Sequence, residues 1–175
     1  PGQQNQIGAM LAQGAKVLVV GAIDGGQLGS QLTAAKDKGI TVIAYDRLLT
    51  NTADVDYYVA FDNFKVGVLQ GTALLEGMAK KKPNGPYNIE LFAGSPDDNN
   101  AKVFFEGWKA EDAQNRMDTL LAGSYTGSTV LDGVLSPNDT LARAILTSVD
   151  AAGKAIPVVT GQDSEVESIK SIMAG

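Results

Sequence analysis

The stretch Thr41-Val42-Ile43-Ala44-Tyr45-Asp46-Arg47 decides the fold class of this chain. Its central residues are apolar on both faces of an extended segment, which is typical of a buried strand in a parallel sheet. Similar runs at 17–20, 89–92, 130–135 and 156–159 precede Asp24, residues 97–100, Asn138-Asp139 and Gln162-Asp163. In open α/β sheets ligands bind beyond the carboxyl ends of the strands, so the pattern predicts a binding site there.

Amphipathic helical patterns alternate with these runs. We expect strands at 16–21, 41–45, 57–61, 87–93 and 156–160, and helices at 3–13, 27–37, 63–80, 109–122 and 140–152. A last helix follows Ser164-Glu165-Val166-Glu167, which has the form of a capping box. The alternation predicts an α/β fold whose parallel sheet is covered on both sides. Right-handed crossovers then place every β→α turn at one edge of the sheet.

One stretch breaks the alternation. Two helical patterns, 99–107 and 109–122, follow each other with no strand between them, although a parallel sheet needs a strand for each crossover helix. Either one long helix is interrupted at Gly107-Trp108, or a segment that belongs between residues 107 and 108 is absent from the sequence. We favour the second interpretation.

The composition excludes several classes of function. The chain has no Cys and no His, which removes disulfides, thiolate metal sites and imidazole-dependent triads. The net charge of −6 argues against a nucleic-acid partner. The basic run Lys80-Lys81-Lys82 fits a solvated helix end. No apolar stretch approaches the roughly 20 residues of a membrane span, and no phosphate-binding fingerprint occurs.

Asp46 and Arg47 are the first candidate site residues. A carboxylate only accepts hydrogen bonds, whereas a guanidinium offers a rigid set of donors. Side by side at a strand end, the two groups could hold adjacent hydroxyl groups of one ligand. The alternative is a local ion pair in a loop.

The segment Gly94-Ser95-Pro96-Asp97-Asp98-Asn99-Asn100-Ala101 is more specific. Its Gly and Pro make a sharp turn, and an Asx residue can cap the next helix, but four consecutive Asx residues exceed what capping needs. A catalytic carboxylate pair and a Mg²⁺ site are alternatives. Trp108, the only Trp, is either partly buried or an aromatic plate for a sugar ring.

Asn138-Asp139 and Gln162-Asp163 repeat the arrangement after two further strands. Each pair alone is explained by helix capping. Their joint occurrence with the earlier clusters favours a ligand rich in hydroxyl groups.

These residues resemble the type I periplasmic sugar-binding proteins of ABC transporters, in the xylose-binding and multiple-monosaccharide-binding (ChvE-like) branch. The resemblance covers nearly the whole chain and is carried by residues 14–20, 42–48, 61–63, 88–101, 136–139 and 161–163. The long Asx-rich block is its most specific marker.

The resemblance implies two Rossmann-like lobes that close over a monosaccharide. Residues 1–61 would be part of the N-terminal lobe and residues 62–175 part of the C-terminal lobe. The implied sugar contacts are Asp46 and Arg47 from the first lobe, Asp98, Asn100, Asn138 and Asp163 from the second, and Trp108 by stacking. The family also has strands and helices before the match to Pro1, between 107 and 108, and after the match to Gly175.

The implied function is that of a periplasmic, monomeric solute-binding protein, with its signal peptide outside this sequence. Its partners would be an ABC permease and, for signalling, a chemoreceptor or sensor kinase, without a cofactor, metal or nucleic acid. The alternatives are the ligand domain of a LacI-type transcription regulator, which needs a basic helix-turn-helix, and a carbohydrate-active hydrolase that uses Asp97 or Asp98.

Overall fold

A computed structural model describes residues 2–94 and 110–175 of the chain. Among these residues, the contacts within the chain define two compact units, and the boundary between them in the sequence falls after Asn63. The lobe boundary expected at 61/62 concerns the lobes of a complete protein and stays a prediction.

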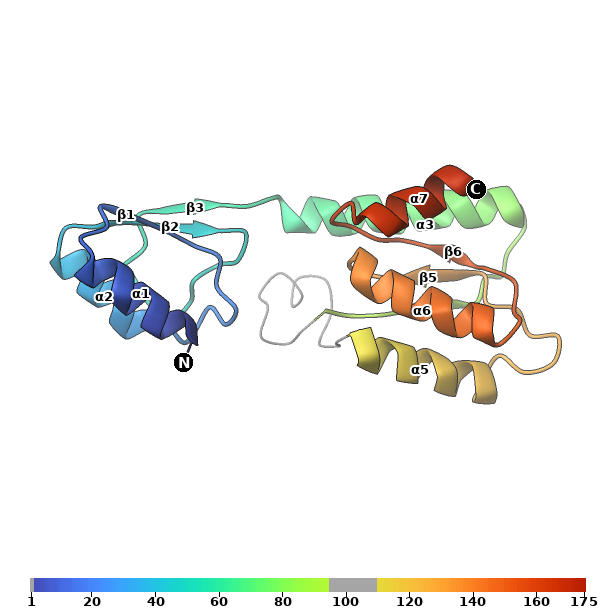
Figure 1. Cartoon of the computed structure of the whole chain (residues 1–175). Coiled ribbons are helices and arrows are strands. Elements are labelled where there is room, and N and C mark those ends of the chain that lie inside the picture. Colours follow the sequence, from blue (N-terminus) through green and yellow to red (C-terminus); the bar gives the residue numbers. More distant parts are fainter. Residues whose placement is uncertain (1, 95–109) are drawn as a thin grey trace. The chain divides into compact units, whose positions relative to one another are not determined.

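The first unit is a three-stranded parallel sheet in the order β1-β2-β3. Its elements are α1 (Gly2–Ala12), β1 (Val17–Val20), α2 (Gly29–Asp37), β2 (Thr41–Tyr45) and β3 (Tyr57–Val59). Val17 pairs with Thr41, and Ile43 pairs with Tyr57. Both helices lie on the same side of this sheet (Figure 1).

Burial alternates along the strands of the first unit. Leu18, Val20, Val42 and Ala44 are buried in one cluster with apolar residues of α1 and α2. The opposite side chains are apolar too, yet Val19 is 64% exposed and Tyr57 63% exposed. The expectation of a sheet covered on both sides is therefore wrong for the described residues of this unit, because both of their helices pack on one face.

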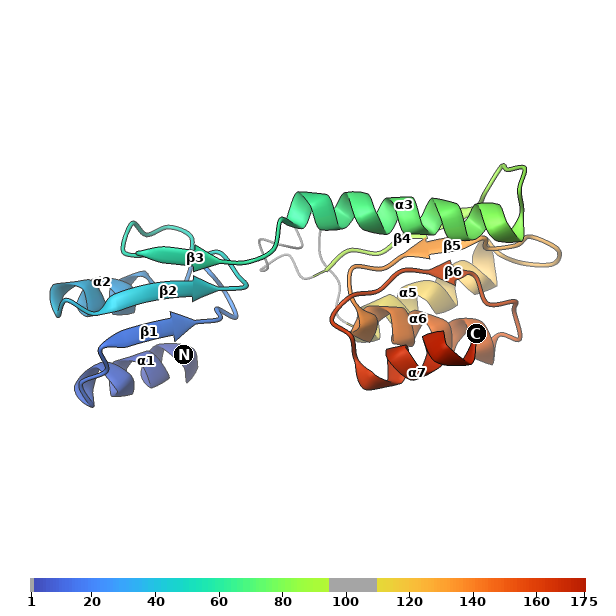
Figure 2. The same ribbon diagram turned by 90° about the horizontal axis from the view of Figure 1, so that it is seen from above.

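The second unit is also a parallel sheet, in the order β4-β5-β6, and helices lie on both sides of it (Figures 1 and 2). Its elements are α3 (Asn63–Lys81), β4 (Ile89–Leu91), α5 (Ala110–Gly123), β5 (Gly133–Leu135), α6 (Asp139–Ala151), β6 (Val158–Val159) and α7 (Val166–Ala174). Helices α3 and α7 lie on one side, and α5 and α6 lie on the other (Figure 1). The expectation of two covered faces is confirmed here.

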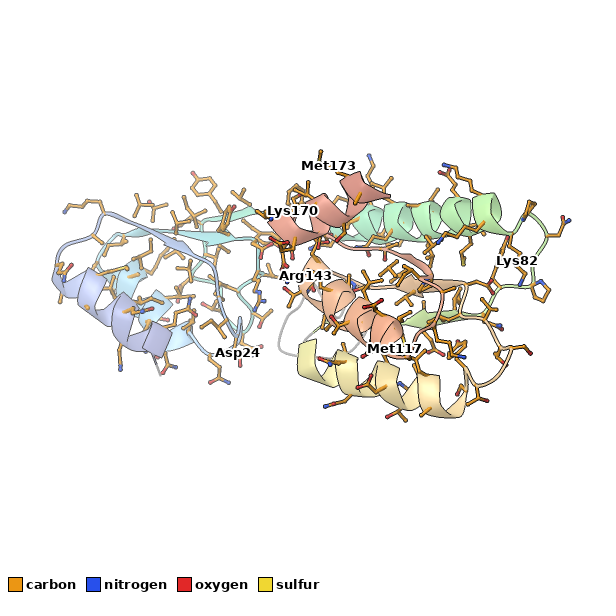
Figure 3. The ribbon with its side chains drawn as sticks, turned by 45° about the vertical axis from the view of Figure 1, so that its right-hand side comes forward. Asp24, Lys82, Met117, Arg143, Lys170 and Met173 are labelled. Atoms are coloured by element: carbon orange, nitrogen blue, oxygen red, sulfur yellow. The ribbon has the colours of Figure 1, made fainter. Side chains whose placement is uncertain are left out.

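The core of the second unit lies between β5 and the helix pair α5–α6. Met117 and Ile145 are fully buried in it with Val134, and Figure 3 shows Met117 between the two helices. On the other face α3 approaches the sheet closely, since a Cβ at Gly133 would lie 2.5 Å from the Met78 sulfur. Glycine at this position lets the helix and strand backbones come together.

The ends of the helices follow from local chemistry. Gly39 (φ 69°) and Gly153 (φ 63°) stop α2 and α6 in the left-handed conformation, as expected. The capping-box prediction for the last helix is wrong. Ser164 has a φ of 56°, and the N-cap residue is Glu165, which makes no side-chain cap. The strands expected at 87–93 and 156–160 are present as β4 and β6, but both are shorter than expected.

Candidate functional site

Asp46 lies directly after β2, at the carboxyl end of the first sheet, and its side chain is exposed. Its φ of 64° is unusual for a residue with a side chain. The backbone holds it there: Asp46 N donates to Val59 O at 2.8 Å, and Tyr58 Oη donates to Asp46 O at 3.3 Å. The carboxylate therefore sits on a corner that β2 and β3 build together.

Arg47 connects this corner to the end of β1. Its Nη1 donates to the backbone oxygens of Ile23 at 2.9 Å and Ala22 at 3.4 Å. Asp24 follows Ile23, and its Oδ1 accepts from Gly26 N at 2.9 Å; Figure 3 shows it in the loop after β1. The turns after β1 and β2 thus place a guanidinium and two carboxylates at one edge of the first sheet.

Asn138 lies at the carboxyl end of β5, in the second unit. Its Oδ1 accepts from Leu141 N at 2.9 Å, which confirms the expected helix cap at the start of α6. The cap uses the amide oxygen, and the Nδ2 group of the same side chain carries two N–H donors. Asn138 can therefore cap the helix and donate to a ligand at the same time.

Asp163 lies in the turn between β6 and α7 and is exposed. Its φ is 91°, and that of Ser164 is 56°. The turn is tied to the end of β5, since Asp139 N donates to Gln162 O at 2.9 Å. Just below, Ser136 N donates to the buried Thr160 Oγ1 at 2.9 Å. The corners that carry Asn138 and Asp163 are therefore adjacent.

The structure adds Gln70, which the sequence did not single out, and gives further detail on Gln162, which the sequence pairs with Asp163. Gln70 of α3 is only 7% exposed, and its Nε2 donates to Pro137 O at 3.4 Å, next to Asn138. Within the described part of the chain, the buried Oε1 atoms of Gln70 and Gln162 have no hydrogen-bond partner. Buried acceptors of this kind call for a donor. Gln70 did not stand out in the sequence, because a Gln in an amphipathic helix is ordinary.

Asp98, Asn100 and Trp108 lie outside the described residues, as does Asp97. The contribution of these residues to the site stays a prediction. Across residues 2–94 and 110–175, no group of three or more acidic side chains is close enough to hold a metal ion.

A cavity of about 150 Å³ lies elsewhere in the second unit. Leu121, Tyr125, Val130 and Lys154 line it, together with the chain that leads into β5. Tyr125 Oη donates to Glu90 at 2.9 Å, and burial followed by this bond raises the pKa of the Tyr125 hydroxyl to about 12. Because the cavity lies at the amino ends of the strands and is mostly apolar, it is not the candidate site for a polyol.

The family comparison decides the class of protein. The profile described as "Periplasmic binding protein domain" matches residues 1–110 and 102–175. This chain belongs to the periplasmic binding protein family.

Two curated relatives are similar to this periplasmic binding protein over its full length. The multiple sugar-binding periplasmic receptor ChvE of Rhizobium radiobacter is 46% identical over 210 residues, and SbpA of Azospirillum brasilense is 45% identical over the same length. The D-xylose-binding periplasmic protein of Escherichia coli is 35% identical over 198 residues, which include 99% of the chain. The chain spans 59%, 58% and 57% of the lengths of these three relatives, in the order given.

Solved structures agree on the fold. An ABC transporter solute-binding protein from Clostridium phytofermentans with bound β-D-glucose matches with a TM-score of 0.90 and 38% identity. A carbohydrate transporter solute-binding protein from Chloroflexus aurantiacus, in complex with D-glucose, has a TM-score of 0.85 and 28% identity. Each comparison covers 99% of this chain, but only 63% and 64% of the solved chains.

These findings confirm the predicted fold class, parallel α/β units of the type I periplasmic binding proteins, and the predicted branch. The names of the two relatives describe them as sugar-binding periplasmic proteins, which supports the binding-protein prediction over the LacI-type alternative. No helix within the described residues is long and apolar enough to cross a membrane.

Proposed function

We propose that this periplasmic binding protein captures a monosaccharide, an aldopentose or aldohexose, and delivers it to an ABC permease. The observation that carries the proposal is the chemistry at the carboxyl ends of the strands. Asp46 and Arg47 stand there in the first unit, and Asn138 and Asp163 stand there in the second. Relatives named as multiple sugar-binding and D-xylose-binding proteins support it.

The proposed site matches the hydrogen-bonding capacity of a sugar. Each hydroxyl group donates one hydrogen bond and accepts others, so carboxylates and a guanidinium can share a pair of neighbouring hydroxyls. A hydrogen bond to a charged group contributes about 1.5–3 kcal/mol net. Micromolar affinity requires about −8 kcal/mol, so a few such bonds suffice once they outweigh the cost of association. Asp98, Asn100 and stacking on Trp108 complete the proposed contacts.

The proposed cycle involves binding and release, without breaking a bond in the sugar. The two lobes would close over the ligand in the periplasm and expel water. A monomer in the closed form would then present a new surface to the permease in the inner membrane. A chemoreceptor or sensor kinase would bind the same surface. An enzyme would differ in one measurable way, because it would convert its sugar whereas a binding protein returns it unchanged.

Titration calorimetry of the native protein with D-glucose and D-xylose tests the proposal. We expect micromolar or tighter binding of at least one sugar, and its loss in Asp163→Ala with an unchanged unfolding temperature. Asp150→Ala is the matched control, because Asp150 is an exposed carboxylate in the last turn of α6, at the other end of the unit. Equal affinity in Asp163→Ala and the unsubstituted protein would contradict the assignment of Asp163.

A further inference from the structure

The turn that carries Asp163 has a backbone conformation that needs support. Asp163 and Ser164 are consecutive residues with side chains, and both have positive φ angles, 91° and 56°. Such conformations persist only where the surroundings hold them, and they gather at ligand sites. Contacts from neighbouring segments are therefore needed to hold residues 161–165.

Asp139 holds this turn from both sides. Its carboxylate is buried, with the residue 7% exposed, and its Oδ2 accepts from Glu165 N at 2.9 Å. Its backbone N donates to Gln162 O at 2.9 Å. Its Oδ1 lies against Gly161, where a Cβ would overlap it. One residue in the first turn of α6 thus contacts the chain before and after Asp163.

Glu165 adds a second attachment to α6. Its carboxylate accepts from the hydroxyl of Thr140 and from Arg143 Nη1, the latter at 2.9 Å. The bond from Thr140 and, to a smaller extent, the bond from Arg143 lower the pKa of the Glu165 carboxyl. Figure 3 shows Arg143 on α6 near the chain that leads into α7. The turn is therefore fastened to three residues of a single helix.

Asp139 is not needed as a helix cap, because Asn138 already caps α6 through Leu141 N. An acid in the first turn also stabilises a helix through the macrodipole, but an exposed carboxylate would serve that purpose equally well. Burial against Gly161 and a bond to a neighbouring loop are specific to this position.

We propose that Asp139 is a positioning residue for sugar binding, which clamps residues 161–165 so that Asp163 is in place before the sugar arrives. The inference rests on the proposed function, in which Asp163 contacts the sugar. A ligand group held in its bound conformation spares the ordering cost that a mobile turn would add at each binding event.

The test combines sugar affinity with site-resolved amide exchange on the native protein, with D-glucose and D-xylose as probes. In Asp139→Ala we expect the affinity for the sugar to fall about tenfold or more, because the turn would then have to become ordered at each binding event. The amides of residues 162–165 should exchange faster, while those of β5 and the middle of α6 keep their rates. Asp139→Asn retains an acceptor for Glu165 N–H, so it should recover most of the affinity.

Two further variants keep the test decisive. In Gly161→Ala the added Cβ would overlap Asp139 Oδ1. This variant should show the same loss of affinity and the same faster exchange of residues 162–165, and it replaces Asp139→Ala in the test if that variant fails to fold. Glu167→Ala removes an acid from the first turn of α7, where it pairs with Lys170, and should change neither measurement.

The outcomes separate the two proposals. Binding by the unsubstituted protein with unchanged affinity in Asp139→Ala overturns the clamp alone. Faster exchange spread over β5 and α6 also overturns it, because Asp139 would then support the whole unit and not the turn. No binding of either sugar by the unsubstituted protein overturns the proposed function, and with it the role of Asp139 in sugar binding.

Discussion

At the scale of single residues, Asn138 combines two tasks in one side chain. Its amide oxygen caps α6, and its amide nitrogen is the group that we propose for the sugar. The two tasks use different atoms, so substitutions can separate them. Ser and Asn are similarly good N-cap residues, whereas Ala is a poor one.

We predict that Asn138→Ser and Asn138→Ala differ in stability but share a loss of affinity. The free energy of unfolding of the Ser variant should lie within a few tenths of a kcal/mol of that of the unsubstituted protein. That of the Ala variant should be lower by about 0.5–2 kcal/mol. Both lack the amide donor, so both should bind the sugar roughly tenfold more weakly, the effect of about 1.4 kcal/mol. Urea unfolding and calorimetry measure the two effects, and full affinity in Asn138→Ser would contradict a sugar contact by Nδ2.

The same residues show what the sequence can and cannot predict about a site. The cap at Asn138 was predictable because the signal is local: an Asx residue before an amphipathic run. The capping box at Ser164 failed because Ser164 adopts a positive φ in a turn held from α6. For Asp139 the sequence predicts only a role in capping, because its contacts with Gly161 and Glu165 join segments more than 20 residues apart and leave no local signal.

At the scale of elements, the contact of α3 with its sheet depends on small residues. A Cβ at Gly77 would lie 2.7 Å from Val158 Cγ1 of β6. Val is stiff at χ1, so it cannot rotate away cheaply. At Gly71, six residues earlier on the same helix, an added Cβ would meet no described atom within 4 Å. The two glycines therefore respond differently to the same substitution.

We predict that Gly71→Ala stabilises the protein and Gly77→Ala destabilises it. In a helix interior Ala is better than Gly by roughly 0.8–1 kcal/mol, which is the expected gain at Gly71. At Gly77 this gain is outweighed by overpacking, which typically costs about 1–3 kcal/mol. Thermal unfolding of both variants measures the difference, and a higher midpoint in Gly77→Ala than in the unsubstituted protein would disprove close packing of α3 on β6.

The elements themselves were largely predictable, because strands that are apolar on both faces and helices with one apolar side leave a clear pattern. Which faces of the two sheets are covered by helices was not predictable. In the first unit Val19 and Tyr57 belong to strands that look fully buried in the sequence, yet these side chains are exposed. The composition of a strand shows that its second face is apolar, but it does not show whether another segment covers that face.

At the scale of the whole molecule, two findings bear on the proposed gap after Gly107. The family profile matches in two overlapping segments, 1–110 and 102–175. The alignment with the Rhizobium radiobacter receptor extends over 210 positions, although the chain has 175 residues. Both support our proposal that the native protein has a further segment between residues 107 and 108, where a strand is expected.

We predict that peptide mapping of the native protein will detect this segment. Trypsin cleaves after Lys102 and Lys109, so the printed sequence yields the peptide Val103-Phe104-Phe105-Glu106-Gly107-Trp108-Lys109. If a segment is present, that peptide is absent, and Gly107 is followed by other residues in a peptide that begins at Val103. The tryptic peptide 155–170 is the control for coverage. Detection of the printed peptide would rule out the segment, and residues 99–122 would then have to form the interrupted helix that we set aside.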